Sequence, residues 1–134
     1  MLRTILVPAL ALSALAGCSV DALTYTIGHY GEVKGVRVRL GCNDAYEVFD
    51  RKSANSLLVV TNAINEVVMN SCTGLAGLPR SERMQRVATF YLEESAGRPD
   101  CKVARENPVS EFHTEFSYTC REPRAPKKDA RPRP

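Results

Sequence analysis

Six short stretches of the chain have the apolar pattern of β-strands. Between Val36 and Leu40, apolar residues take every second position and arginines lie between them. Successive side chains of a strand point to opposite faces, so this alternation predicts a strand that is buried on one side. The other stretches predicted as strands are 23–27, 46–49, 57–60, 101–105 and 111–120.

These stretches are predicted to pair as hairpins. The polar residues 50–55 separate 46–49 from 57–60, and residues 29–32 provide a turn after the first stretch. A turn near Asn107-Pro108 joins the last two stretches. Folding that hairpin about residues 110 and 111 places Cys101 opposite Cys120, at a separation that suits a disulfide.

Between these hairpins the period changes to that of a helix. The first predicted helix has Thr61 or Asn62 as its cap, and the second begins at Ser81 and ends before Gly97 and Pro99. Each has one apolar face that needs a sheet to cover. The first face consists of Ile64, Val67, Val68 and Cys72, and the second of Met84, Val87, Ala88, Tyr91 and Leu92.

The fold class expected from this order is α+β, with a β-β-β-β-α-α-β-β arrangement. A small antiparallel sheet of about six strands is predicted, covered by two helices. The chain has 134 residues and no internal repeat. It is too short for a barrel or a doubly wound sheet, which leaves one small domain.

The N-terminus has the organisation of a secretory signal. Arg3 is the one charge before an uncharged, leucine- and alanine-rich stretch from Thr4 to Gly17. The apolar run from Thr4 to Val20 is seventeen residues long and contains a proline. A membrane span needs about 20 apolar residues, so a cleaved signal at 1–17 is favoured over a permanent transmembrane anchor.

Leu15-Ala16-Gly17-Cys18 closes this segment and resembles the lipobox of bacterial lipoproteins. The resemblance covers about the first nineteen residues. It implies that Cys18 becomes the mature N-terminus and carries fatty acyl chains on its thiol and its amino group. Ser19, in place of aspartate, implies by the same resemblance that the protein is sorted to the outer membrane. The alternative is an ordinary cleaved signal followed by an unmodified cysteine.

Assigning Cys18 to lipid leaves an even number of cysteines. In the oxidising periplasm the remaining four are expected to form two disulfides. Three connectivities are possible, and the hairpin geometry favours Cys101 with Cys120, which leaves Cys42 with Cys72. The spacings contain no C-x-x-C pair, which argues against a zinc site.

Charge is distributed unevenly along the chain. The body from 18 to 120 holds eleven basic and thirteen acidic residues, whereas the last fourteen residues carry six basic and two acidic ones. This tail, 121–134, contains four prolines and too little apolar surface to fold alone, so it is expected to be disordered. Its cations suit an anionic polymer such as peptidoglycan or anionic lipid, and the alternative is a solvated spacer. The six cations are Arg121, Arg124, Lys127, Lys128, Arg131 and Arg133.

Candidate catalytic residues are few. His113 lies between Glu111 and Glu115 on one face of a predicted strand, where neighbouring carboxylates would favour its charged form. The spacing of about 7 Å between alternate strand residues is wide for joint metal ligation, so a solvated face is preferred. His29 is interpreted as a turn residue, with stacking on Tyr30 as the alternative. No nucleophile elbow or phosphate loop is present, so no catalytic, metal or cofactor residue is assigned.

The function favoured by these observations is that of a non-enzymatic envelope lipoprotein. We expect a structural or interaction component of an envelope or secretion assembly, held at the outer membrane with its domain in the periplasm and contacting a protein partner. Nucleic acid is not an expected partner of an exported chain. Two alternatives remain open: a periplasmic inhibitor or ligand-binding module, similar in build to lipid-anchored lysozyme inhibitors, and a small hydrolase.

Overall fold

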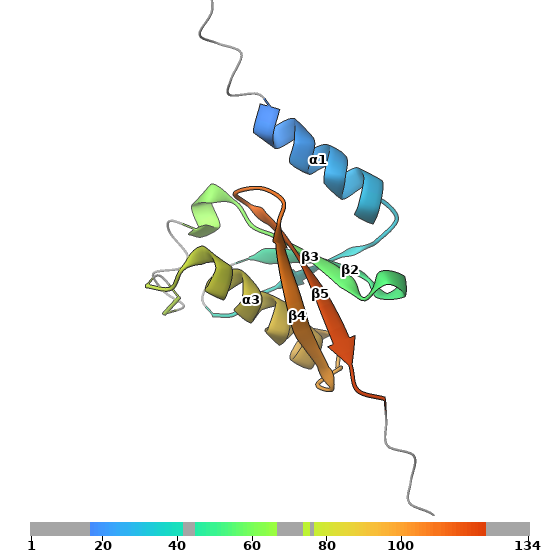
Figure 1. Cartoon of the computed structure of the whole chain (residues 1–134). Helices are drawn as coiled ribbons and strands as arrows, with labels where there is room; N and C mark the ends of the chain where they lie inside the picture. The colour runs from blue at the N-terminus through green and yellow to red at the C-terminus, as the bar shows by residue number, and fades with distance from the viewer. Residues whose placement is uncertain (1–16, 42–44, 67–73, 76, 123–134) are drawn as a thin grey trace, which may run out of the picture.

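The computed structural model describes residues 17–41, 45–66, 74–75 and 77–122. It shows an α+β fold in which one antiparallel sheet has a helix against each face (Figure 1). The strand order across the sheet is β1-β2-β3-β5-β4. The strands are β1 (Gly35–Val38), β2 (Tyr46–Arg51), β3 (Ser56–Val60), β4 (Cys101–Pro108) and β5 (His113–Cys120). The helices are α1 (Gly17–Tyr30) and α3 (Arg80–Phe90), and α3 continues as the π-helical turn η3 (Tyr91–Ser95).

The main hydrophobic core lies between α3 and one face of the sheet. The predicted apolar face of the second helix is confirmed, because Met84, Val87 and Leu92 are fully buried. They pack against side chains from all five strands of the sheet. The strand residues of this core are Val38, Tyr46, Val48, Leu57, Val59, Cys101, Phe116 and Tyr118.

Helix α1 covers the opposite face, and here the sequence prediction was wrong. Residues 23–27 were predicted to form a strand, but they lie within α1. The alternation of large side chains was misleading because Leu23 and Ile27 point away from the protein. The buried residues Ala22 and Tyr30 instead follow helical spacing. The sheet therefore has five strands rather than six.

The predicted hairpin of 46–49 with 57–60 is confirmed as β2 and β3. The two strands pair antiparallel, and the short 3-10 turn η1 (Lys52–Ala54) connects them with Asn55. Asn55 has a left-handed backbone, with φ of 48°. Asparagine tolerates this conformation better than most residues, which explains why it occupies the last position of the turn before β3.

The C-terminal hairpin is confirmed with the predicted register at its open end. Cys101 pairs with Cys120, and the two cysteines form a disulfide. A bulge between Val103 and Arg105 then shifts the pairing by one residue. The turn predicted near Asn107-Pro108 was wrong, because both residues pair with β5 and β4 continues to Pro108 rather than ending at residue 105. The bulge turns the Arg105 position onto the face opposite α3.

The helix ends differ in part from the prediction. Asn62 accepts a hydrogen bond from the Asn65 backbone N–H (2.9 Å), as expected of a cap for the first predicted helix. Ile64, predicted to be buried, is 68% exposed, because the helix start buries Asn65 instead.

Helix α3 begins after Pro79 without a side-chain cap, and Ser81 hydrogen-bonds Glu106 rather than the helix backbone. Residues 67–73, which include most of the first predicted apolar face, lie outside the described residues.

Candidate functional site

Cys18, the residue predicted to carry lipid, lies in the first turn of α1. The helix is connected to β1 by only four residues, 31–34. Gly31 follows the helix directly, and a β-carbon there would lie 2.5 Å from the Ile27 carbonyl oxygen. Cys18 therefore belongs to a helix that packs on the sheet.

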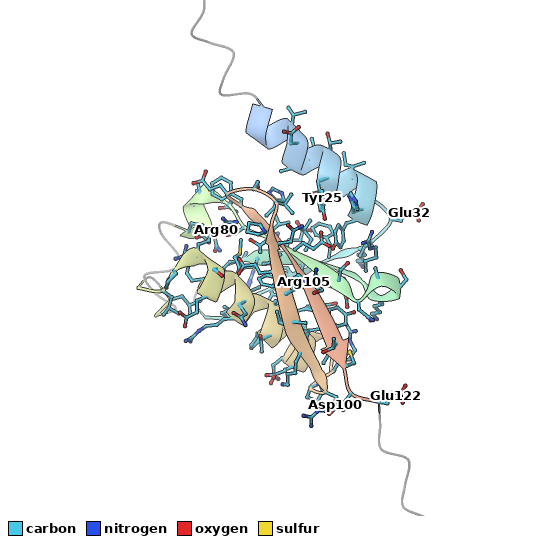
Figure 2. The ribbon with its side chains drawn as sticks, in the orientation of Figure 1. Tyr25, Glu32, Arg80, Asp100, Arg105 and Glu122 are labelled. Carbon is cyan, nitrogen blue, oxygen red and sulfur yellow. A yellow bond between two sulfur atoms is a disulfide. The ribbon has the colours of Figure 1, made fainter. Side chains whose placement is uncertain are left out.

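Two tyrosines fasten α1 to the sheet. The buried Tyr30 hydroxyl donates a hydrogen bond to Ser56 Oγ on β3 (3.0 Å). Tyr25, on the side of α1 that faces the sheet (Figure 2), donates to the Glu115 carboxylate on β5. Arg51 adds a third contact, because its guanidinium lies 5.3 Å from the centre of the Tyr30 ring and its Nη1 donates to the His29 carbonyl (3.3 Å). Both tyrosines bind partners far away in the sequence, which is why sequence patterns did not indicate them.

The environment of these tyrosines keeps both phenols protonated. Burial raises the pKa of Tyr30 to about 12. Burial also raises the pKa of Tyr25 to about 12, with further contributions from its hydrogen bond to Glu115 and from the charge of that carboxylate. A protonated phenol is the hydrogen-bond donor that each contact requires.

His29 belongs to this helix and not to a turn, so its predicted role was wrong. Its ring stacks on Tyr25, with centroids 4.2 Å apart, and not on Tyr30. Its Nδ1 also lies 3.0 Å from the Tyr25 carbonyl oxygen, one helical turn earlier. These contacts give His29 a local structural role in the last turn of α1.

The outer side of α1 is apolar and exposed. Val20 and Leu23 are each 59% exposed and Ile27 is 64% exposed, although α1 is packed on the sheet. We call these three side chains the outer stripe. Leu23 and Ile27 were predicted to lie in a half-buried strand, so the stripe was not predicted. Helical spacing of 20, 23 and 27 was the signal that these residues share one side of a helix.

His113 occupies a different environment from the one predicted. It is half-buried at the start of β5, and its Nδ1 lies 2.8 Å from Ser110 Oγ. Burial lowers its pKa, and the nearby Arg80 charge lowers it further, whereas the neighbouring carboxylates were expected to favour the charged form. Across the parts of the chain that the structure describes, no three His, Cys, Asp or Glu side chains are grouped to bind a metal.

A buried polar cluster lies at the other end of the sheet. The Asp50 carboxylate on β2 is paired with Arg98 and accepts hydrogen bonds from the hydroxyls of Tyr118 (2.9 Å) and Tyr91 (3.2 Å). Burial raises the pKa of Tyr91 to about 12, and the adjacent Asp50 charge contributes. With every carboxylate oxygen bonded, this cluster fixes η3 against the sheet. Sequence analysis did not indicate it, because its members are up to 68 positions apart.

The predicted tail begins beside the disulfide. Arg121 is exposed, and its backbone N–H donates to the Asp100 carbonyl (3.2 Å), next to Cys101 and Cys120. This point and helix α1 lie at opposite ends of the molecule (Figure 2). The other basic tail residues (Arg124, Lys127, Lys128, Arg131 and Arg133) lie outside the described residues. So do Cys42 and Cys72, whose pairing stays a prediction.

No family model, curated protein or solved structure matches this chain. Among residues 17–41, 45–66, 74–75 and 77–122, no helix combines the length and the apolar character needed to cross a membrane.

Proposed function

We propose that this protein is a lipoprotein of the bacterial envelope, attached to the outer membrane through acyl chains on Cys18. The observation that carries the proposal is the coincidence of the Leu15-Ala16-Gly17-Cys18 tetrapeptide with the end of an apolar N-terminal run. Helix α1 supports it, because it continues directly from Cys18 into the domain. Several acyl chains anchor stably, since each buried CH₂ contributes about 0.8 kcal/mol.

The experiment is metabolic labelling with a radioactive or clickable fatty acid. The wild-type protein should incorporate the label, and Cys18→Ser should not, because the thiol is the acceptor. Ser19→Ala is the matched control, since it alters the adjacent residue without removing the thiol. Equal labelling of wild type and Cys18→Ser, or no labelling of either, would reject the proposal.

The role proposed for the anchored domain is non-enzymatic binding of another envelope component. A five-stranded sheet with a helix packed on each face and a disulfide at its end is a rigid support for a contact surface. The periplasmic partner is expected to be a protein. In-cell crosslinking of the wild-type protein should recover a specific partner, and recovery of a cell-wall hydrolase would favour the inhibitor alternative. A protein that crosslinks to nothing would contradict the binding role.

The pair Ser110 and His113 favours a small hydrolase as the second candidate. A serine hydroxyl bonded to a neutral imidazole is a pair that nucleophilic enzymes use, and the lowered pKa of His113 favours the neutral ring. The same residues also close the turn before β5, because Ser110 Oγ accepts the Phe112 N–H (3.2 Å). Ester hydrolysis that His113→Ala and Ser110→Ala both abolish, with folding unchanged by circular dichroism, would favour the enzyme. Equal turnover in these variants and the wild type would reject it.

A further inference from the structure

We propose that helix α1 lies in the plane of the membrane surface, with its outer stripe of Val20, Leu23 and Ile27 inserted among the lipids and its inner side packed on the sheet. This inference rests on the proposed acylation of Cys18. It goes further by assigning α1 itself as a lipid-binding surface. The domain would then sit directly against the bilayer and not at the end of a flexible linker.

The arrangement of the stripe fits an interfacial helix. At 100° per residue, Val20, Leu23 and Ile27 fall within an arc of about 60° on one side of the helix. Their spacing along the axis is about 10 Å from first to last, which suits a helix lying flat. Asp21 is the one acidic residue of α1, and it lies about 100° from Val20, outside that arc. Apolar side chains on one face and a polar remainder are the features of helices that bind at the interface.

The inner side of α1 is packed on the sheet. Ala22 and Tyr30 are buried, and the Tyr30 and Tyr25 hydroxyls are bonded to Ser56 and Glu115. The helix therefore cannot rotate to bury the stripe without breaking both hydrogen bonds. The exposure of the stripe is thus a property of the packed helix, and any group that covers it must come from outside the described part of the chain.

The position of Cys18 identifies the bilayer as that group. Acyl chains on Cys18 would hold the membrane surface two residues from Val20, at the end of the stripe. A second copy of the protein that covered the same side chains would do so without contact to lipid, so the fluorescence test distinguishes the two occupants.

The absence of tryptophan from the sequence provides a direct test. Leu23→Trp and Ile27→Trp each place a single fluorophore on the stripe. Phe90→Trp is the matched control, because Phe90 is 37% exposed on α3, on the opposite face of the sheet. The full acylated proteins are purified from membranes and reconstituted into phosphatidylethanolamine and phosphatidylglycerol vesicles. Some of these vesicles contain lipids that are brominated in their acyl chains.

The stripe variants should show blue-shifted emission and at least about twofold stronger quenching by brominated lipid than Phe90→Trp. Using two stripe positions guards against one variant that fails to fold. Mass spectrometry of the same samples reports the acyl groups on Cys18. Acylated protein whose stripe variants are quenched no more than Phe90→Trp would overturn the inference while leaving the proposed function standing.

Two other results also overturn it. A blue shift that depends on protein concentration and is insensitive to brominated lipid would show that a second copy covers the stripe. Mass spectra without acyl groups on Cys18 would overturn the proposed function, and this inference with it.

Discussion

At the residue scale, the buried Asp50 carboxylate depends on its ion-pair and hydrogen-bond partners for its stability. Its side chain is 4% exposed, and Arg98, Tyr91 and Tyr118 provide all its partners. A buried carboxylate is tolerated only where such donors replace water. Removing the charge leaves the Arg98 guanidinium, which is itself largely buried, without its counterion.

Asp50→Asn should therefore lower the free energy of unfolding by about 3 kcal/mol, as expected when one partner of a buried ion pair is removed. Urea denaturation followed by circular dichroism measures this. Glu82→Gln is the matched control, because it breaks an exposed ion pair with Arg86 on α3 and should cost less than about 0.5 kcal/mol. Equal effects of the two variants would show that the Asp50 cluster does not stabilise the fold.

His113 makes stability depend on pH. Folding lowers its pKa from the ordinary value of 6.5, so the unfolded chain binds the proton first as the pH falls. The stability that neutral His113 contributes is complete above pH 6.5 and is lost as the pH falls toward the lowered pKa.

The wild-type protein should therefore lose more stability between pH 7.5 and pH 5.5 than His113→Asn does. Urea midpoints at the two pH values provide the comparison. His29→Asn, which changes an exposed ring on α1, serves as the control. The prediction fails if His113→Asn and wild type lose stability equally over that interval.

At the scale of elements, a disulfide between Cys101 and Cys120 joins the ends of β4 and β5 that lie away from the hairpin turn. The two cysteines are 19 positions apart in the sequence. The bond ties the strand that follows η3 to the last strand of the sheet. In the loop-entropy view, a crosslink of this span restricts the unfolded chain and so stabilises the fold.

Replacing both cysteines, as Cys101→Ala with Cys120→Ala, should lower the free energy of unfolding by about 3 kcal/mol. Non-reducing peptide mapping of the wild type should also recover the two cysteines in one disulfide-linked peptide pair. The same mapping tests the predicted Cys42 to Cys72 bond. Recovery of Cys101 linked to Cys42 or Cys72 would contradict the hairpin assignment.

At the scale of the whole molecule, the proposed anchor and the start of the basic tail lie at opposite ends. Helix α1 carries Cys18 at one end, and the chain leaves the last strand at Arg121 at the other (Figure 1). With α1 at the membrane, the six basic tail residues would start on the side of the domain that faces away from it. The body carries a slight excess of acidic residues, so attraction to an anionic polymer would come from the tail.

The full protein should bind isolated peptidoglycan, and a chain truncated after Cys120 should lose that binding. Co-sedimentation at low salt measures it. Because the screening length falls from about 10 Å at 0.1 M to about 3 Å at 1 M salt, the binding should also disappear at high salt. A full-length variant with Lys127, Lys128, Arg131 and Arg133 changed to Gln keeps the length of the tail but removes four of its six positive charges. It therefore tests whether the charge of the tail or its length is needed for binding. Undiminished binding of the truncated chain would assign the tail the role of a spacer.

The predictions from sequence succeeded where one element or one hairpin decides the outcome. Residues 111–120 were predicted to form a strand paired with 101–105, and folding about residues 110 and 111 gave the pairing of Cys101 with Cys120. The apolar face of α3 followed from helical spacing alone. In each case the pattern repeats every two residues or every helical turn, so neighbours in sequence carry the information.

The tertiary structure decided which side chains are buried, because burial depends on which element covers each face of a helix or sheet. Residues 23–27 carry large side chains that fit a strand or a helix, and only packing of Tyr25 and Tyr30 on the sheet makes them part of α1. Burial of His113 beside Arg80 likewise reversed the expected direction of its pKa. Local periodicity determines where side chains point, whereas desolvation and hydrogen bonding come from residues distant in the chain. For this reason the exposure of the outer stripe follows only from the tertiary structure, in which the other side of α1 packs on the sheet.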